Sequence, residues 1–285
     1  MSELRLLDDR RTLPIGVFDS GVGGLTVLHE LLVWLPHEDF VYLGDTARFP
    51  YGERSRDELE RFALQIAQLL VQRGAKLLVV ACNAATAAAL PALESRLSRL
   101  APELAVLGVV GPGCRLASNA TASGRIGLLG TTATVLSGAY KRGLRACSED
   151  LTLTSVACPD LAPIVQAGFP FDQRVVDTVR GYCRPLRSAN VDTVILGCTH
   201  YPLVAPMLQR SLGPAVRLIA AGAAVAGEVQ RVLDAQHLTN PRPDEGDYRF
   251  LCTGDVASFR DLGTRFLQMP LGEVEHVDLD AEMAA

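Results

Sequence analysis

Short apolar runs alternate with longer amphipathic stretches along nearly the whole chain. The runs have the length of buried strands and lie at 15–19, 40–44, 76–81, 105–110, 125–130, 153–157, 192–197, 215–220 and 248–253. Between 56 and 74, apolar residues from Leu59 to Leu70 recur at helical spacing, and Gly74 follows as a helix cap. This alternation is typical of βαβ units and predicts an α/β fold with mostly parallel sheets.

Two pairs of segments indicate a weak internal duplication. IGVFDSGVGGLTVL aligns with IGLLGTTATVLSG, and LLVVACNAATAAAL aligns with TVILGCTHYPLVAP at a similar offset, which places Cys82 over Cys198. We therefore expect two pseudo-symmetric α/β domains, residues 1–107 with 217–285 and residues 108–216. Since open α/β sheets bind ligands beyond the carboxyl ends of their strands, the active site is expected in the cleft between the domains.

Composition narrows the class of protein. The chain has 285 residues, is 48% hydrophobic and 21% charged, and carries a net charge of -5 without a basic block. This is the composition of a globular protein and predicts no nucleic-acid partner and no membrane surface. The amino-terminal segment lacks the apolar core of a secretory signal, so we expect a cytoplasmic protein. Seven scattered cysteines without a CxxC pair disfavour disulfides and a zinc ribbon.

Cys82 and Cys198 each follow a predicted strand and precede a predicted helix, the second beginning near Pro202. Free N–H groups and the positive dipole end of a helix lower a thiol's pKa, so both positions are expected to favour the thiolate. Two thiols facing each other across a substrate carbon, about 7 Å apart, can remove a proton from one face and deliver one to the other. The alternatives are two inert buried thiols, or a metal site that adds His200 and Cys158.

Other polar residues follow strands in the same way. Asp19 and Ser20 suit an ammonium group or the orientation of a thiol, and the alternative is a helix N-cap. His200 can be an acid, a base, a ligand of the substrate or a satisfied interior histidine. The irregular loop 45–55 is a candidate lid in which Tyr51 and Gly52 face a substrate. The glycines of FDSGVGG resemble a phosphate-binding turn but match neither GxGxxG nor the P-loop pattern, and the alternative is a tight turn without a ligand.

Six segments together resemble the glutamate racemases of the aspartate/glutamate racemase superfamily. They run in order from about residue 14 to about residue 270 and include IGVFDSGVGGLTVL, YLGDTARFPYG, VVACNAATA, IGLLGTTATVLSGAY, VACP and VILGCTHYPLV. The resemblance implies cofactor-independent interconversion of L- and D-glutamate, which supplies D-glutamate for peptidoglycan. It implies no cofactor and no metal, glutamate as the small-molecule partner, and leaves a homodimer open.

The resemblance also assigns residues. Cys82 would be the base towards D-glutamate and Cys198 the base towards L-glutamate. The residues that would bind substrate or tune the thiols are Asp19, Ser20, Tyr51, Gly52, Asn83, Ala84, Thr199, His200, Thr131 and Thr134.

Three positions depart from the family pattern. Ala84 stands where a threonine is common, Gln166 where a glutamate is usual, and Gly111 where many relatives have glutamate. Ala84 removes a hydroxyl contact to substrate, while its backbone N–H can still hold a carboxylate. Two alternatives to glutamate racemisation remain at this point: racemisation of aspartate or a related compound, and amino-acid or anion binding without catalysis.

Overall fold

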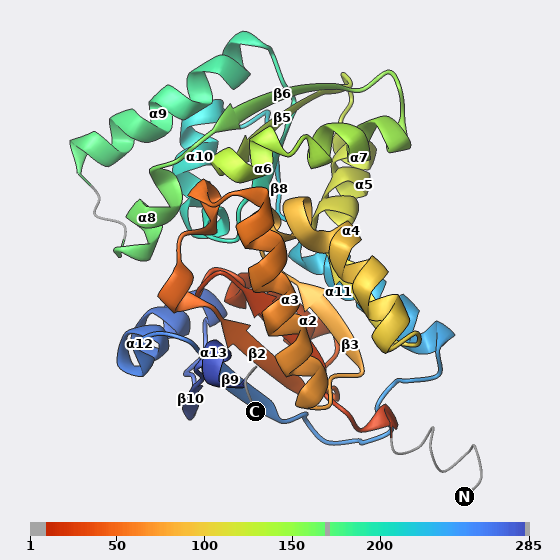
Figure 1. Ribbon diagram of the computed structural model, residues 1–285. Helices are drawn as coiled ribbons and strands as arrows, with labels where there is room; N and C mark the ends of the chain where they lie inside the picture. The colour runs from red at the N-terminus through yellow and green to blue at the C-terminus, as the bar shows by residue number, and fades with distance from the viewer. Residues whose placement is uncertain (1–9, 169–171, 283–285) are drawn as a thin grey trace, which may run out of the picture.

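The computed structural model describes residues 10–168 and 172–282, and its strands form two sheets, one above the other in Figure 1. The first sheet has six parallel strands in the order β10-β9-β2-β1-β3-β4. These strands are β1 (Ile15–Asp19), β2 (Phe40–Gly44), β3 (Leu77–Val80), β4 (Ala105–Gly108), β9 (Tyr248–Cys252) and β10 (Val274–His276).

The second sheet has four parallel strands in the order β6-β5-β7-β8. They are β5 (Arg125–Gly130), β6 (Thr152–Ala157), β7 (Thr193–Gly197) and β8 (Arg217–Ile219). This order repeats β2-β1-β3-β4 of the first sheet, so the predicted pair of pseudo-symmetric α/β halves is confirmed. The domain boundaries expected from the sequence stay a prediction; β8 pairs with β7 in the second sheet, just beyond the expected boundary at residue 216.

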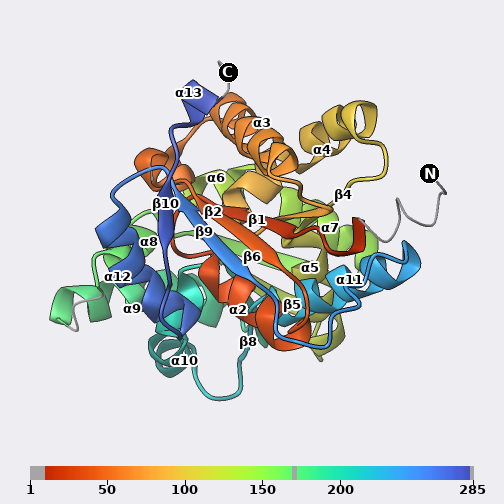
Figure 2. The same ribbon diagram turned by 90° about the horizontal axis from the view of Figure 1, so that it is seen from below.

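Helices cover both faces of the first sheet because its strands are apolar on both sides. Ile15 and Val17 pack towards one layer, while Phe18 packs towards the other. The first layer holds α2 (Leu25–Trp34), α11 (Gly222–Ala235) and α12 (Val256–Leu267), and the second holds α3 (Arg56–Gln72), α4 (Asn83–Leu100) and α13 (Leu279–Glu282). Figure 2 shows the strands between these two layers.

The second sheet is also enclosed. One face packs against α8 (Leu161–Gln166), α9 (Gln173–Ser188) and α10 (Ala205–Leu212), and the other against α5 (Val110–Ala120) and α7 (Ala139–Cys147). Helix α6 (Thr132–Leu136) contacts α4 and the short 3-10 helix η2 (Tyr51–Glu53), so it joins the two halves on the side of the loop 45–55.

The expected elements are found with small shifts at their ends. The strands at 15–19, 40–44 and 125–130 have the predicted bounds. The predicted helix α3 begins with a capping box between Ser55 and Glu58 and ends before Gly74, whose φ of 86° suits glycine. Strand β10 was not predicted, because its three residues VEH are too short and too polar to give a strand pattern.

Candidate functional site

Both candidate thiols lie at the carboxyl ends of equivalent strands. Cys82 follows β3 and is the N-cap residue of α4, and Cys198 directly follows β7. They are 5% and 7% exposed and line one small cavity between the two halves. The predicted convergence of the two cysteine segments is therefore present in the structure.

The small cavity collects most of the predicted site residues. It is lined by Ser20, Phe49, Pro50, Tyr51, Gly52, Cys82, Asn83, Ala84, Thr131, Ala162, Gly197, Cys198, Thr199 and His200. Its volume is about 20 Å³, room for about one water molecule. An amino acid can enter only when the walls move apart, so this is a closed form of the site.

Two predicted residues lie beside the cavity without lining it. Asp19 is fully buried and accepts a hydrogen bond from the backbone N–H of Gly24 at 2.8 Å, at the start of α2. Thr134 is 1% exposed, and its hydroxyl lies 3.0 Å from that of Thr131, which does line the cavity. Asp19 therefore caps the glycine turn before α2 and lies next to the residues that line the cavity. Thr134 holds the Thr131 side chain in place through the contact between their hydroxyls.

Polar groups of the first half surround Cys82. The side chains of Asp19 and Ser20 lie next to its thiol. Burial raises the pKa of Cys82 to about 12, and the negative charge of Asp19 adds to that rise. Burial also raises the pKa of the Asp19 carboxyl, although its hydrogen bonds from Gly24 and Cys82 oppose the shift. Cys82 therefore has a carboxylate of increased basicity next to it.

Cys198 has a histidine instead. Its Sγ lies 3.8 Å from Nδ1 of His200, and the opposite ring nitrogen, Nε2, lies 2.8 Å from Oε1 of Gln166. Because the amide oxygen of Gln166 accepts a hydrogen bond from Nε2–H, Nδ1 carries the lone pair that faces the thiol. Gln166, the second departure from the family pattern, thus orients the imidazole without adding a charge.

His200 is held in an apolar environment. Its ring packs against Phe49, with centroids 5.5 Å apart, and against the edge of Phe266 at 5.2 Å. Burial lowers the pKa of His200 to about 3. The imidazole is therefore neutral at physiological pH and can accept a hydrogen bond from the thiol of Cys198.

The expectation that the helix ends favour both thiolates is wrong for this closed form. Burial raises the pKa of Cys198 as well, and the backbone N–H of His200 only partly offsets the rise. For Cys82 the backbone N–H of Ala85 acts in the same limited way. Removing the thiolate from water costs more free energy than a hydrogen bond from one backbone N–H restores. In addition, the element that follows Cys198 and contains Pro202 is only a short 3-10 helix, η3 (Tyr201–Val204), before α10.

The glycines of FDSGVGG permit close approach between the halves. A Cβ on Gly23 would lie 2.4 Å from both Nδ1 of His200 and Oγ1 of Thr199, which no side chain can occupy. Nearby, the Thr199 hydroxyl donates to Asp19 at 3.4 Å, and Thr26 donates to the carbonyl of Thr199 at 3.1 Å. The glycines therefore let this turn pack against the segment that follows Cys198. They serve this close contact within the protein, and a phosphate-binding pattern is not needed to explain them.

The loop 45–55 forms one wall of the small cavity. It contains two short 3-10 helices, η1 (Thr46–Arg48) and η2. Tyr51 donates a hydrogen bond to the fully buried carboxylate of Asp45, which also binds Arg48 and Thr253. A Cβ on Gly52 would lie 2.8 Å from Cβ of Thr131. The loop therefore seals the cavity by backbone contact with the second half, as expected of a lid in its closed position.

Several lining residues were not predicted. Phe49, Pro50 and Ala162 supply apolar wall, and Phe49 belongs to a loop whose aromatic residues were already a signal. Tyr140 reaches the site by a hydrogen bond to Asn83, and no local pattern indicates this because the two residues lie in different halves. Of the remaining departures, Ala84 lines the cavity, whereas Gly111 lies on α5 outside the lining.

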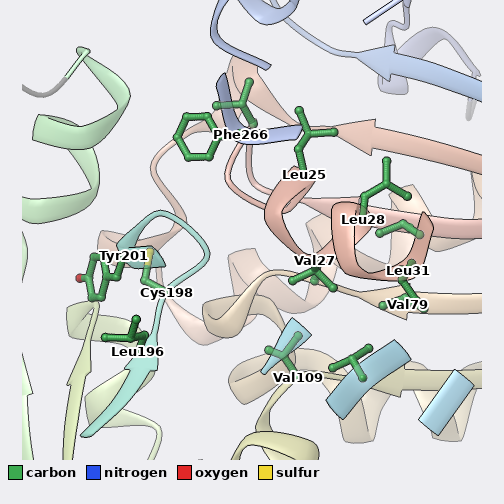
Figure 3. Close-up of a cluster of buried hydrophobic side chains, with 14 of the residues drawn as sticks. Leu25, Val27, Leu28, Leu31, Val79, Val109, Leu196, Cys198, Tyr201 and Phe266 are labelled. Atoms are coloured by element: carbon green, nitrogen blue, oxygen red, sulfur yellow. The ribbon is translucent and has the colours of Figure 1, made fainter. Parts of the chain in front are cut away.

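A second, larger cavity of about 430 Å³ adjoins the small one and shares Asn83, Cys198 and Thr199 with it. Figure 3 shows part of its apolar wall, with Leu196 and Cys198 on one side and Val27 and Val109 on the other. Asn83, Cys198 and Thr199 thus lie between the small cavity and the larger one.

Two further features concern metals and membranes. Within residues 10–168 and 172–282, no group of three or more His, Cys, Asp or Glu residues could hold a metal ion. Cys158, a member of the alternative metal set, instead directs its thiol towards the carbonyl of Val156 at 3.6 Å. No helix in the described part of the chain is long and apolar enough to cross a membrane.

Comparison with known proteins identifies the class. The family model for Asp/Glu/Hydantoin racemases matches residues 27–229. The chain therefore belongs to the Asp/Glu/Hydantoin racemase family. It is 43% identical over 265 residues to the glutamate racemase of Listeria innocua, an alignment that covers 93% of this chain and 98% of the relative.

Solved structures narrow the class further. Glutamate racemase isoform RacE1 of Bacillus anthracis superimposes with a TM-score of 0.88 at 38% identity, covering 94% of this chain and 98% of the other. The glutamate racemase of Francisella tularensis, solved in complex with D-glutamate, gives 0.87 at 32% identity, covering 95% and 99%. The expectation of an amino-acid racemase of the glutamate racemase type, an isomerase that acts on a small molecule, is confirmed.

Proposed function

We propose that this enzyme interconverts L- and D-glutamate without a cofactor, using Cys82 and Cys198 as its acid/base pair. The observation that carries the proposal is that both thiols, from equivalent strand ends in the two halves, line one cavity. A substrate α-carbon held between them can lose its proton to one sulfur and receive a proton from the other on the opposite face.

Each direction of the reaction uses both thiols. With D-glutamate, the Cys82 thiolate removes the α-proton and the Cys198 thiol donates its own, which leaves Cys82 as the thiol and Cys198 as the thiolate. With L-glutamate the roles reverse. Because burial keeps both thiols protonated in the closed form, the thiolate that starts each direction forms while the site is open to water. Asp19 beside Cys82 and Nδ1 of His200 beside Cys198 then orient the thiols as hydrogen-bond acceptors.

The α-proton of an amino acid is only weakly acidic, so the site must stabilise the negative charge that develops. In a closed, dry cavity, fixed donors act on that charge without reorganising. The candidate donors are the hydroxyl of Ser20, the amide of Asn83 and the backbone N–H of Ala84. Closure of the loop that carries Tyr51 and Gly52 then excludes water during proton transfer.

Similarity supports glutamate over aspartate as the substrate. The relatives named above are glutamate racemases over nearly their full length, and the Francisella tularensis relative was solved with D-glutamate. We propose accordingly that the enzyme works in the cytoplasm and supplies D-glutamate for peptidoglycan.

Circular dichroism of the purified enzyme with L-glutamate, without added cofactor, tests the proposal. The signal should decay to zero as the racemic mixture forms. A matched reaction with L-aspartate should keep its signal. Decay with aspartate alone would assign the enzyme to the other racemase activity, and an unchanged signal with both substrates would leave a binding protein.

A further inference from the structure

Tyr140 connects the two cysteine segments from a position outside the small cavity. It lies on α7 in the second half, is 1% exposed, and donates its hydroxyl to Oδ1 of Asn83 at 2.6 Å. Asn83 is the residue after Cys82, at the start of α4 in the first half. The hydrogen bond therefore crosses between the halves at the site.

The phenol ring is held on two sides by backbone. A Cβ on Gly113 would lie 3.6 Å from Cε1 of Tyr140, and a Cβ on Gly197 would lie 3.5 Å from Cε2. Gly197 is the residue before Cys198. The ring thus packs against the segment of one thiol while its hydroxyl binds the segment of the other.

The hydroxyl determines which way the Asn83 amide faces. Among the described residues, Tyr140 is the only partner of Oδ1, and the amide nitrogen Nδ2 has none. If the amide turned over, the buried hydroxyl would lose its acceptor. Burial, with the nearby Cys114 and Cys198, raises the pKa of Tyr140, which keeps the phenol protonated and able to donate.

We propose that Tyr140 is a positioning residue: it holds the Asn83 amide so that Nδ2–H groups face the substrate and bind its carboxylate. Asn83 lines the small cavity, and an amide donor there complements an anionic substrate. This inference rests on the proposed function and adds to it a residue that does not itself line the cavity.

Kinetics of Tyr140→Phe test the proposal, with both enantiomers of glutamate as substrates. We expect KM to rise about tenfold in both directions, as for loss of one well-placed hydrogen bond to a charged group, and kcat to change less than about threefold. Tyr182→Phe is the matched control. The Tyr182 hydroxyl donates a hydrogen bond of 2.7 Å to Asp160, and neither residue lines the cavity. This control should keep the wild-type KM and kcat.

A double-mutant cycle distinguishes positioning from general stability. Asn83→Ala should raise KM, and adding Tyr140→Phe to it should change KM by less than about twofold, because the two residues act through one contact. Wild-type KM in Tyr140→Phe, or effects that add in the double variant, would overturn the inference while leaving racemisation intact.

Asn83→Asp gives a second approach that leaves Tyr140 unchanged. The carboxylate still accepts the Tyr140 hydroxyl but has no N–H to offer, so KM should rise at least as much as in Asn83→Ala; an unchanged KM would overturn the inference even if Tyr140→Phe does not fold. An inactive wild-type enzyme would instead overturn the proposed function, and this inference with it.

Discussion

Each thiol has a different hydrogen-bond acceptor beside it. Cys82 adjoins the carboxylate of Asp19, whose pKa is raised by burial, and Cys198 adjoins the neutral imidazole of His200. The two directions of racemisation therefore begin from chemically different pairs. Because the proposed mechanism uses one thiol as base and the other as acid in each turnover, loss of either sulfur should interrupt both directions.

We expect Cys82→Ser and Cys198→Ser each to lower turnover by about 10²- to 10⁴-fold with either enantiomer, since a serine hydroxyl is a far weaker acid than a thiol. Polarimetry with L- and D-glutamate measures this directly. Cys147→Ser removes the exposed cysteine at the end of α7 and should leave turnover unchanged. Wild-type turnover in either of the first two variants would refute the acid/base assignment.

The loop 45–55 depends on one buried carboxylate. Asp45 accepts hydrogen bonds from Arg48 at 2.6 Å, from Thr253 at 2.8 Å and from Tyr51. Burial, followed by the charge of Asp45, raises the pKa of Tyr51, so its hydroxyl remains a donor. These bonds hold both 3-10 helices against the first sheet and hold Tyr51 in the cavity wall.

Asp45→Ala should destabilise the fold by about 3 kcal/mol, because it leaves the largely buried guanidinium of Arg48 without its carboxylate. It should also raise KM for glutamate, since Tyr51 and Gly52 lose their support. Urea unfolding and steady-state kinetics measure the two effects. As a control, Glu60→Ala breaks an exposed ion pair with Arg56 and should cost less than about 1 kcal/mol. Equal urea midpoints for the two variants would contradict this role of Asp45.

Across the whole molecule, the buried thiols link stability to pH. Burial raises the pKa of Cys82, Cys114 and Cys158 to about 12 and that of Cys183 to about 11. In the unfolded chain, thiols ionise near about 8.5. A pKa raised by folding contributes stability that is complete below about pH 8.5 and is lost as pH rises towards the folded value.

The free energy of unfolding should therefore fall between pH 8.5 and 11, by about 1.4 kcal/mol per pH unit for each such thiol. Cys183→Ala, on α9 away from the cavity, removes one of them. Its unfolding free energy, measured by urea titration at several pH values, should fall less steeply than that of the wild type by about this amount. Parallel slopes would contradict the burial effect.

The strands of each half and the positions of the two cysteines could be predicted from the sequence, whereas the side-chain contacts between the halves could not. Strands such as 15–19 and 125–130 are short continuous apolar runs, so their length and the turn residues that flank them identify them. The aligned positions of Cys82 and Cys198 predict one shared cleft. The direction of the thiol pKa shifts and the Tyr140 to Asn83 hydrogen bond depend instead on burial and on the packing of distant segments, which no local pattern contains.

The most direct test of two opposed thiols is the fate of the α-proton in D2O. We predict that, early in the reaction of L-glutamate, the D-glutamate formed carries deuterium at the α-carbon while the remaining L-glutamate keeps its proton, as followed by proton NMR and chiral chromatography. One thiol removes protium and the other, exchanged with solvent, delivers deuterium. Protium in the early product, or deuterium in the unconverted substrate at the same rate, would contradict the two-base account.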